Sequence, residues 1–127
     1  MSGFTEYFVN KVMDHALGGV AWTPPAVYYV KVHVGYPGST GTEFPSATTT
    51  RQPLTLSTSS GGQVAANVDI HWTSVAREQI SWLSVWTTAG PTGGECIATI
   101  ELDQATNFYT GDTIELPTLT LQILAGA

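Results

Sequence analysis

The side chains best suited to binding a metal ion are two Asp–His pairs, Asp69-x-His71 and Asp14-His15. On a β-strand, Asp69 and His71 would place a carboxylate and an imidazole on one face. A divalent ion needs three or four converging ligands, and the sequence has neither H-x-H nor H-x-x-x-H spacing. We therefore interpret these side chains as solvent-facing polar residues and predict no metal site.

Acidic residues near the C-terminal third could support other chemistry. Glu101 and Asp103 would share a strand face, at a separation that suits acid–base attack on a sugar. No sequence feature indicates a cleft there, so solvated carboxylates are the simpler interpretation. Four oxygen-bearing residues also flank one expected loop and could ligate calcium, but without D-x-D-x-D-G spacing: Asp103, Gln104, Asn107 and Asp112.

Nucleophile and cofactor motifs are missing from the sequence. Gly38-Ser39-Thr40-Gly41 lacks the G-x-S-x-G spacing of a nucleophile elbow, and no strand is expected before it. Cys96 begins an alternating apolar run, which indicates a buried, inert thiol. There is no phosphate-binding loop and no dinucleotide fingerprint. We predict a protein that is not an enzyme and has no cofactor.

Composition narrows the class of protein. The 127 residues predict one domain spanning 1–127, and a single cysteine excludes an intramolecular disulfide. Only 11% of residues are charged, against about 25% in ordinary soluble domains. Four basic residues and a net charge of −6 argue against direct nucleic-acid binding. A surface of Thr, Ser, Gly and Gln suits a subunit packed in an assembly, and equally an extracellular β module.

The N-terminus carries no targeting signal that we recognise. It has no basic n-region followed by an apolar run, and no stretch is long enough to span a bilayer. We expect a protein made in a cytoplasm, with no membrane partner.

One amphipathic helix is predicted from Ser2 to Leu17, ended by Gly18-Gly19 and followed by Pro24-Pro25, which forces an extended chain. Its apolar residues recur at helical spacing: Phe4, Phe8, Val9, Val12, Met13, Ala16 and Leu17. Such a stripe needs an apolar surface to cover, either its own sheet or a neighbouring subunit.

The rest of the chain is predicted to form roughly six or seven short strands, a number typical of an antiparallel β-sandwich or jelly roll. The expected strands are Val27–Val34, Gln52–Leu56, Val64–Trp72, Ile80–Thr87, Glu95–Leu102, Thr113–Leu116 and Thr118–Leu124. Ile80–Thr87 is apolar on both faces, which predicts a central strand covered on both sides. Gly35–Arg51 is expected to be a long, surface-exposed and mobile loop.

Aromatic residues are abundant, with four tryptophans. Trp72, Trp82 and Trp86 are in phase with core positions, so only Trp22 and one tyrosine remain as possible exposed platforms for a sugar.

The order of these segments resembles a family of small tailed-bacteriophage virion proteins, often labelled tail fibre or minor structural protein. The matching segments are residues 10–19, 21–30, 51–54, 80–86, 89–94 and 109–117, of which helix–Gly-Gly–Thr-Pro-Pro is the most specific. The chain departs from the family pattern near Pro117-Thr118-Leu119 and in the polar stretch Ser46–Thr50. The resemblance implies a virion component with a sandwich-like body and no catalytic residues.

From these features we expect a capsid decoration protein that binds the major capsid protein as a small homo-oligomer. The alternatives are a tail or fibre-associated module that contacts host glycans, and a tail-tube or connector component. The interface candidates are Phe4, Phe8, Val12, Trp22 and Tyr29.

Overall fold

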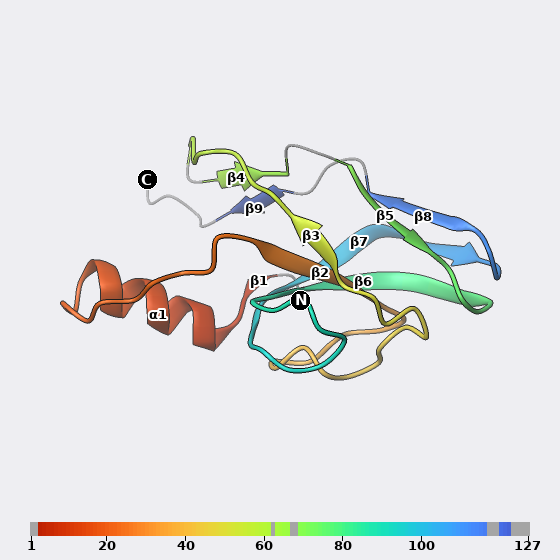
Figure 1. Ribbon diagram of the computed structural model, residues 1–127, viewed down its shortest axis with the longest axis horizontal. Coiled ribbons are helices and arrows are strands. Elements are labelled where there is room, and N and C mark those ends of the chain that lie inside the picture. Colours follow the sequence, from red (N-terminus) through yellow and green to blue (C-terminus); the bar gives the residue numbers. More distant parts are fainter. Residues whose placement is uncertain (1–2, 62, 67–68, 117–119, 123–127) are drawn as a thin grey trace.

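The computed structural model describes residues 3–61, 63–66, 69–116 and 120–122. Its elements are β1 (Gly3–Phe4), α1 (Glu6–Ala16), β2 (Tyr28–His33), β3 (Gln52–Leu54), β4 (Gln63–Ala65), β5 (Ile70–Thr73), β6 (Glu78–Trp86), β7 (Cys96–Phe108), β8 (Thr113–Leu116) and β9 (Thr120–Gln122). The predicted class is confirmed, because the fold is mainly β with antiparallel sheets and one helix near the N-terminus (Figure 1).

The strands form two layers. The larger layer is a five-stranded sheet of order β1-β7-β6-β2-β3, and the second layer consists of the pairs β4–β9 and β5–β8 (Figure 1). The core between them includes Val30 and Val32 of β2, Leu83 and Val85 of β6, and Trp72 of β5. The central position predicted for the 80–87 strand is confirmed, since β6 lies between β2 and β7.

The opposite face of the five-stranded sheet is also covered. Cross-strand pairs on that face join Trp82 to His33, Ser84 to Lys31 and Trp86 to Tyr29. Trp82 and Trp86 are both buried, as their spacing predicted. The two faces of β6 therefore belong to two separate buried regions.

Two register irregularities between β6 and β7 change which residues share a face. Ile80 pairs with Thr106 whereas Trp82 pairs with Glu101, so β7 carries extra residues there and Ile80 joins the core beside Leu83. A second irregularity follows Val85. It places Cys96 opposite Trp86, whereas Ala98 lies in the core, so the predicted common face of Cys96 and Ala98 is wrong.

The helix is shorter than predicted. Gly3–Phe4 pairs with β7 through Ala98 and Thr99, and α1 begins only at Glu6 after the N-cap residue Thr5. The backbone N–H of Thr5 donates to the Ile97 carbonyl at 2.8 Å. Helical periodicity extends through Phe4, but the open edge of β7 offers hydrogen bonds that draw this segment into the sheet.

Two other expectations need correction. The predicted Val64–Trp72 strand is two strands, β4 and β5, which belong to different pairs. The strand predicted to end at Leu102 continues to Phe108 as β7. The last predicted strand corresponds to β9 at Thr120–Gln122, and its other residues lie outside the described ones, as does Val68.

The loop from Gly35 to Arg51 is not wholly exposed. It covers the outer face of the five-stranded sheet, where Pro37, Ser46 and Arg51 are buried. The Ser46 hydroxyl donates to the Glu78 carboxylate, and the backbone N–H of Val75 donates to Thr48 Oγ1 at 3.2 Å. Polar residues can be buried here because each has a hydrogen-bond partner. Hydrophobic patterning in the sequence does not detect burial of this kind.

Candidate functional site

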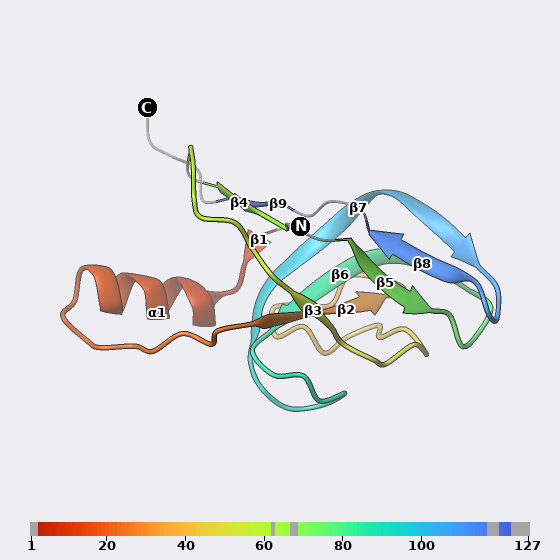
Figure 2. The same ribbon diagram turned by 45° about the horizontal axis from the view of Figure 1, so that its top comes forward.

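Helix α1 and the chain that follows it project from the two β layers. We call residues 6–27, from the start of α1 to the last residue before β2, the N-terminal arm. Two views show α1 to one side of the sheets, joined to them by β1 and by the extended chain that returns to β2 (Figures 1 and 2). No residue of α1 is buried, although the helix is amphipathic. Tyr7 and Phe8 are half-buried against the core, whereas most of the helix is exposed.

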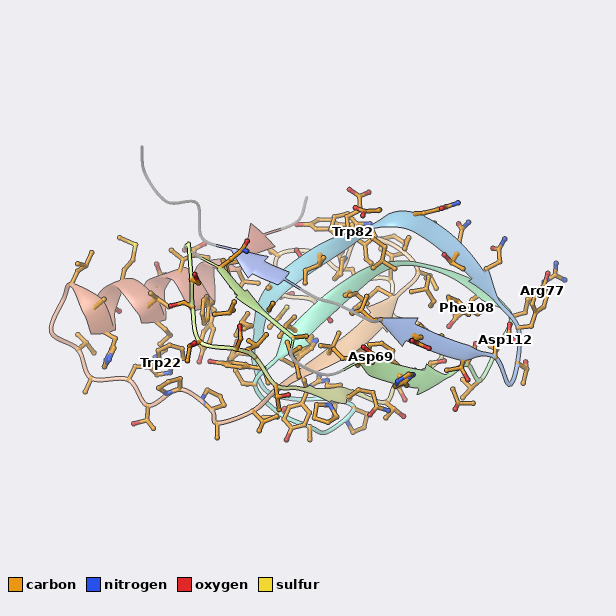
Figure 3. The ribbon with its side chains drawn as sticks, turned by 90° about the horizontal axis from the view of Figure 1, so that it is seen from above. Trp22, Asp69, Arg77, Trp82, Phe108 and Asp112 are labelled. Atoms are coloured by element: carbon orange, nitrogen blue, oxygen red, sulfur yellow. The ribbon has the colours of Figure 1, made fainter. Side chains whose placement is uncertain are left out.

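An aromatic ladder holds the base of the arm. The rings of Phe4 and Phe8 stack with centroids 4.8 Å apart, and Trp22 meets Phe8 edge-on at 6.0 Å. The backbone N–H of Trp22 donates to Nδ1 of His15 at 3.2 Å, which ties the returning chain to the helix (Figure 3). Trp22 is half-buried by these contacts, so it packs within the arm and is not a free platform for a sugar.

Part of the exposed surface of the arm is apolar. Val9, Met13 and Leu17 follow one another at four-residue spacing, so they form one row along α1. We call these residues, with Val20 just beyond the helix, the apolar row; their exposed fractions are 40% for Val9, 52% for Met13, 79% for Leu17 and 57% for Val20.

The five interface candidates from the sequence are all half-buried in the chain: Phe4, Phe8, Val12, Trp22 and Tyr29. Phe4 and Phe8 pack against the core, and Tyr29 lies on β2. Their role in an interface stays a prediction. The apolar row was visible in the helical spacing, except for Val20, which follows the glycines and has no periodic signal.

A close Ser–His pair lies under the 35–51 loop. Nε2 of His33 is 2.6 Å from the Ser84 hydroxyl, and both residues are fully buried. The Trp86 indole N–H donates to the same hydroxyl at 2.6 Å, and Nδ1 of His33 lies 3.0 Å from the Glu43 carbonyl. Burial lowers the pKa of His33 to about 4. This arrangement stabilises a neutral imidazole, and solvent has no access to Ser84.

The structure brings Asp69 and His71 together with a third ligand that the sequence did not pair with them. Glu115 of β8 is the cross-strand partner of His71, and the ligand atoms of all three side chains lie within 4.8 Å of one another. Asp14 and His15, by contrast, lie on α1 and belong to no converging group among the described residues.

The acidic residues near the C-terminal third are spread along β7. Asp103, Gln104 and Asn107 lie within this strand, so the prediction that they flank a loop is wrong. The Asp112 carboxylate accepts the Tyr109 backbone N–H at 2.8 Å and thereby caps the turn before β8. Asp103 lines a pocket of about 310 Å³ between β7 and the β5–β8 pair, whereas Glu101 does not.

Cys96 is buried, as its alternating pattern predicted, although it faces the 35–51 loop. Burial raises the pKa of its thiol to about 11. A thiol of this kind stays protonated at neutral pH, so it does not act as a nucleophile.

Comparison with known families identifies the chain. The family described as podophage GP4 fiber I protein gp80 matches residues 3–124. The chain belongs to this family. The match covers both the N-terminal arm and the β layers, and it confirms the resemblance to phage virion structural proteins that the sequence suggested. No curated protein matches the chain.

Within the described residues of this fibre-family chain, no helix has the length and apolar character to cross a membrane. Membership of a phage fibre protein family implies association with other virion proteins.

Proposed function

We propose that this chain is a structural, non-enzymatic subunit of a phage fibre, attached to neighbouring virion proteins through its N-terminal arm. One observation carries the proposal: the apolar row is exposed, although Phe8 of the same helix packs against the core. An exposed row of apolar side chains along a helix is typical of a surface that packs against another subunit.

Energetics support the apolar row as the contact surface. Burial of apolar area contributes about 25 cal/mol per Å², so covering roughly 300 Å² would stabilise the contact by about 7 kcal/mol before association costs. The neighbouring residues Asn10, Lys11 and Asp14 are exposed and polar, and they would rim such a contact.

A capsid decoration protein, seated on the major capsid protein, is the second candidate. The arm projects clear of the β layers, which would let it reach across a boundary between two capsid subunits (Figure 2). In both placements we propose that copies of the chain form a small homo-oligomer. The family name supports the fibre placement over this one.

Charge substitutions in the arm test the proposal. Met13→Glu places a carboxylate in the apolar row, and Val75→Glu is the matched control because its side chain is similarly exposed, at 57% against 52%, outside the arm. We expect both variants to fold with wild-type melting temperatures. In phage complemented with each variant, Met13→Glu should be incorporated into virions about 10-fold less, and Val75→Glu normally.

Imaging of the same particles would show where in the virion the chain lies. Density for the chain in a fibre supports the first candidate, and density confined to the head shell supports decoration. Normal incorporation of Met13→Glu would contradict attachment through the arm.

A half-buried position in the arm should behave differently. Phe8 packs against the core and between Phe4 and Trp22, so Phe8→Asp is expected to destabilise the fold itself by about 2 kcal/mol or more. Wild-type stability of Phe8→Asp would show that the ladder does not hold the arm.

A further inference from the structure

We propose that Asp69, His71 and Glu115 form a binding site for a divalent transition-metal ion, with Zn²⁺ as the best fit. Asp69 and His71 are two residues apart at the start of β5, and Glu115 is the partner of His71 across the β5–β8 pair. All three side chains are exposed, on the face of the β5–β8 pair opposite the buried Trp72 and Ile114. This site does not depend on the proposed function.

The geometry needs only small side-chain movements. Nδ1 of His71 lies 3.8 Å from Oε2 of Glu115, and the three ligand atoms fall within 4.8 Å of one another. Ligands at about 2.0–2.1 Å around a tetrahedral ion are roughly 3.3 Å apart. His71 and Glu115 side chains are each 52% exposed, so rotation of their outer bonds can close this gap.

The ligand chemistry selects the class of ion. One imidazole nitrogen with two carboxylate oxygens suits Zn²⁺, whereas Ca²⁺ and Mg²⁺ prefer sites made entirely of oxygen. Three protein ligands leave a fourth tetrahedral position for water or for a group from another molecule.

Local charge favours a cation at this place. The cluster holds two carboxyl groups, and like charges repel when they lie close together. Among the described contacts, no lysine or arginine pairs with Asp69 or Glu115; Arg77 lies over the Tyr109 ring at 5.2 Å. A divalent ion would neutralise the cluster and link β5 to β8, which otherwise pair only with each other.

Titration of the full chain with Zn²⁺ alone tests the site. We expect one ion bound per chain by calorimetry and a rise in the melting temperature. His71→Ala and Glu115→Gln should each weaken binding about 100-fold or more and abolish the thermal shift. His15→Ala, which removes an exposed histidine elsewhere, should leave both unchanged.

Imidazole resonances in NMR spectra provide a readout that does not depend on variants. Zn²⁺ should shift the His71 ring resonances and leave those of His33 and His15 in place. Absence of binding by the wild-type chain would overturn the proposal, as would equal binding by wild type and His71→Ala. Binding lost only in His15→Ala would also overturn it, because the ion would then sit on the arm.

Discussion

The Nε2 atom of His33 lies 2.6 Å from the Ser84 hydroxyl in the fully buried interior beneath the 35–51 loop. Since Trp86 donates to Ser84 Oγ, the Ser84 hydroxyl hydrogen is free to donate to Nε2. Nδ1–H then donates to the Glu43 carbonyl at 3.0 Å. The polar hydrogens of His33, Ser84 and the Trp86 indole therefore all donate to a partner. These bonds stabilise the neutral imidazole, which connects β2, β6 and the 35–51 loop.

This neutral histidine predicts a loss of stability in mild acid. Burial lowers the pKa of His33 from 6.5 to about 4, so between these values the unfolded chain binds more protons than the folded one. The free energy of unfolding therefore falls as pH decreases, by about 2 kcal/mol from pH 7 to pH 5. Urea denaturation over this range measures the effect.

His33→Gln should be less stable at pH 7 and should lose most of this pH dependence. His71→Gln is the matched control, because its side chain is exposed and its removal should leave the pH dependence in place. An unchanged slope in His33→Gln would contradict the assignment.

Thr5 connects the N-terminal arm to the sheet through two hydrogen bonds. Its hydroxyl donates to the Cys96 carbonyl at 2.6 Å and accepts the Phe8 backbone N–H as the helix N-cap. Thr5→Ala removes both bonds, and we expect a loss of about 2 kcal/mol in urea denaturation. Thr5→Ser keeps the hydroxyl and should retain most of the stability; equal losses in the two variants would exclude this role.

Gly41 allows the loop to lie close against the sheet. Its φ is +77°, and an added Cβ would lie 2.6 Å from Cys96 Sγ and 2.9 Å from the Trp86 ring. Gly41→Ala should therefore destabilise the protein by about 3 kcal/mol, through backbone strain and overlap together. Thermal unfolding measures the loss.

Gly93→Ala is the control for strain alone, since its φ is +86° and nothing lies within 4 Å of the added Cβ. We expect a loss of about 1 kcal/mol in that variant. Similar losses at the two glycines would show that the contact with Cys96 and Trp86 is loose.

The Cys96 thiol should be unreactive in the folded protein. With a pKa of about 11, only about one thiol in a thousand is ionised at pH 8, and its burial blocks access as well. Iodoacetamide should label Cys96 only after denaturation, as followed by mass spectrometry. Ser39→Cys adds an exposed thiol and should be labelled at once; rapid labelling of wild type would show that the loop opens.

The sequence predicted the elements whose patterns are local. Alternating residues identified β2, and a run that is apolar on both faces identified the central strand β6. The burial of three tryptophans followed from their phase. The start of α1 was misplaced because Phe4 satisfies the helical spacing equally well. Residues 3–4 form a strand because they pair with the open edge of β7. That strand is distant in the sequence, since Cys96 lies 91 residues after Thr5.

Sequence by itself determined the class of the molecule: a charge-poor, mainly β chain with one amphipathic helix, without sequence motifs of catalysis. Only the tertiary structure decided which surfaces are available. It left the apolar row of α1 exposed, buried the His33–Ser84 pair, and set Glu115 beside Asp69 and His71. Periodicity specifies which side of a strand or helix is apolar, whereas cross-strand register and the packing of loops depend on contacts between distant residues.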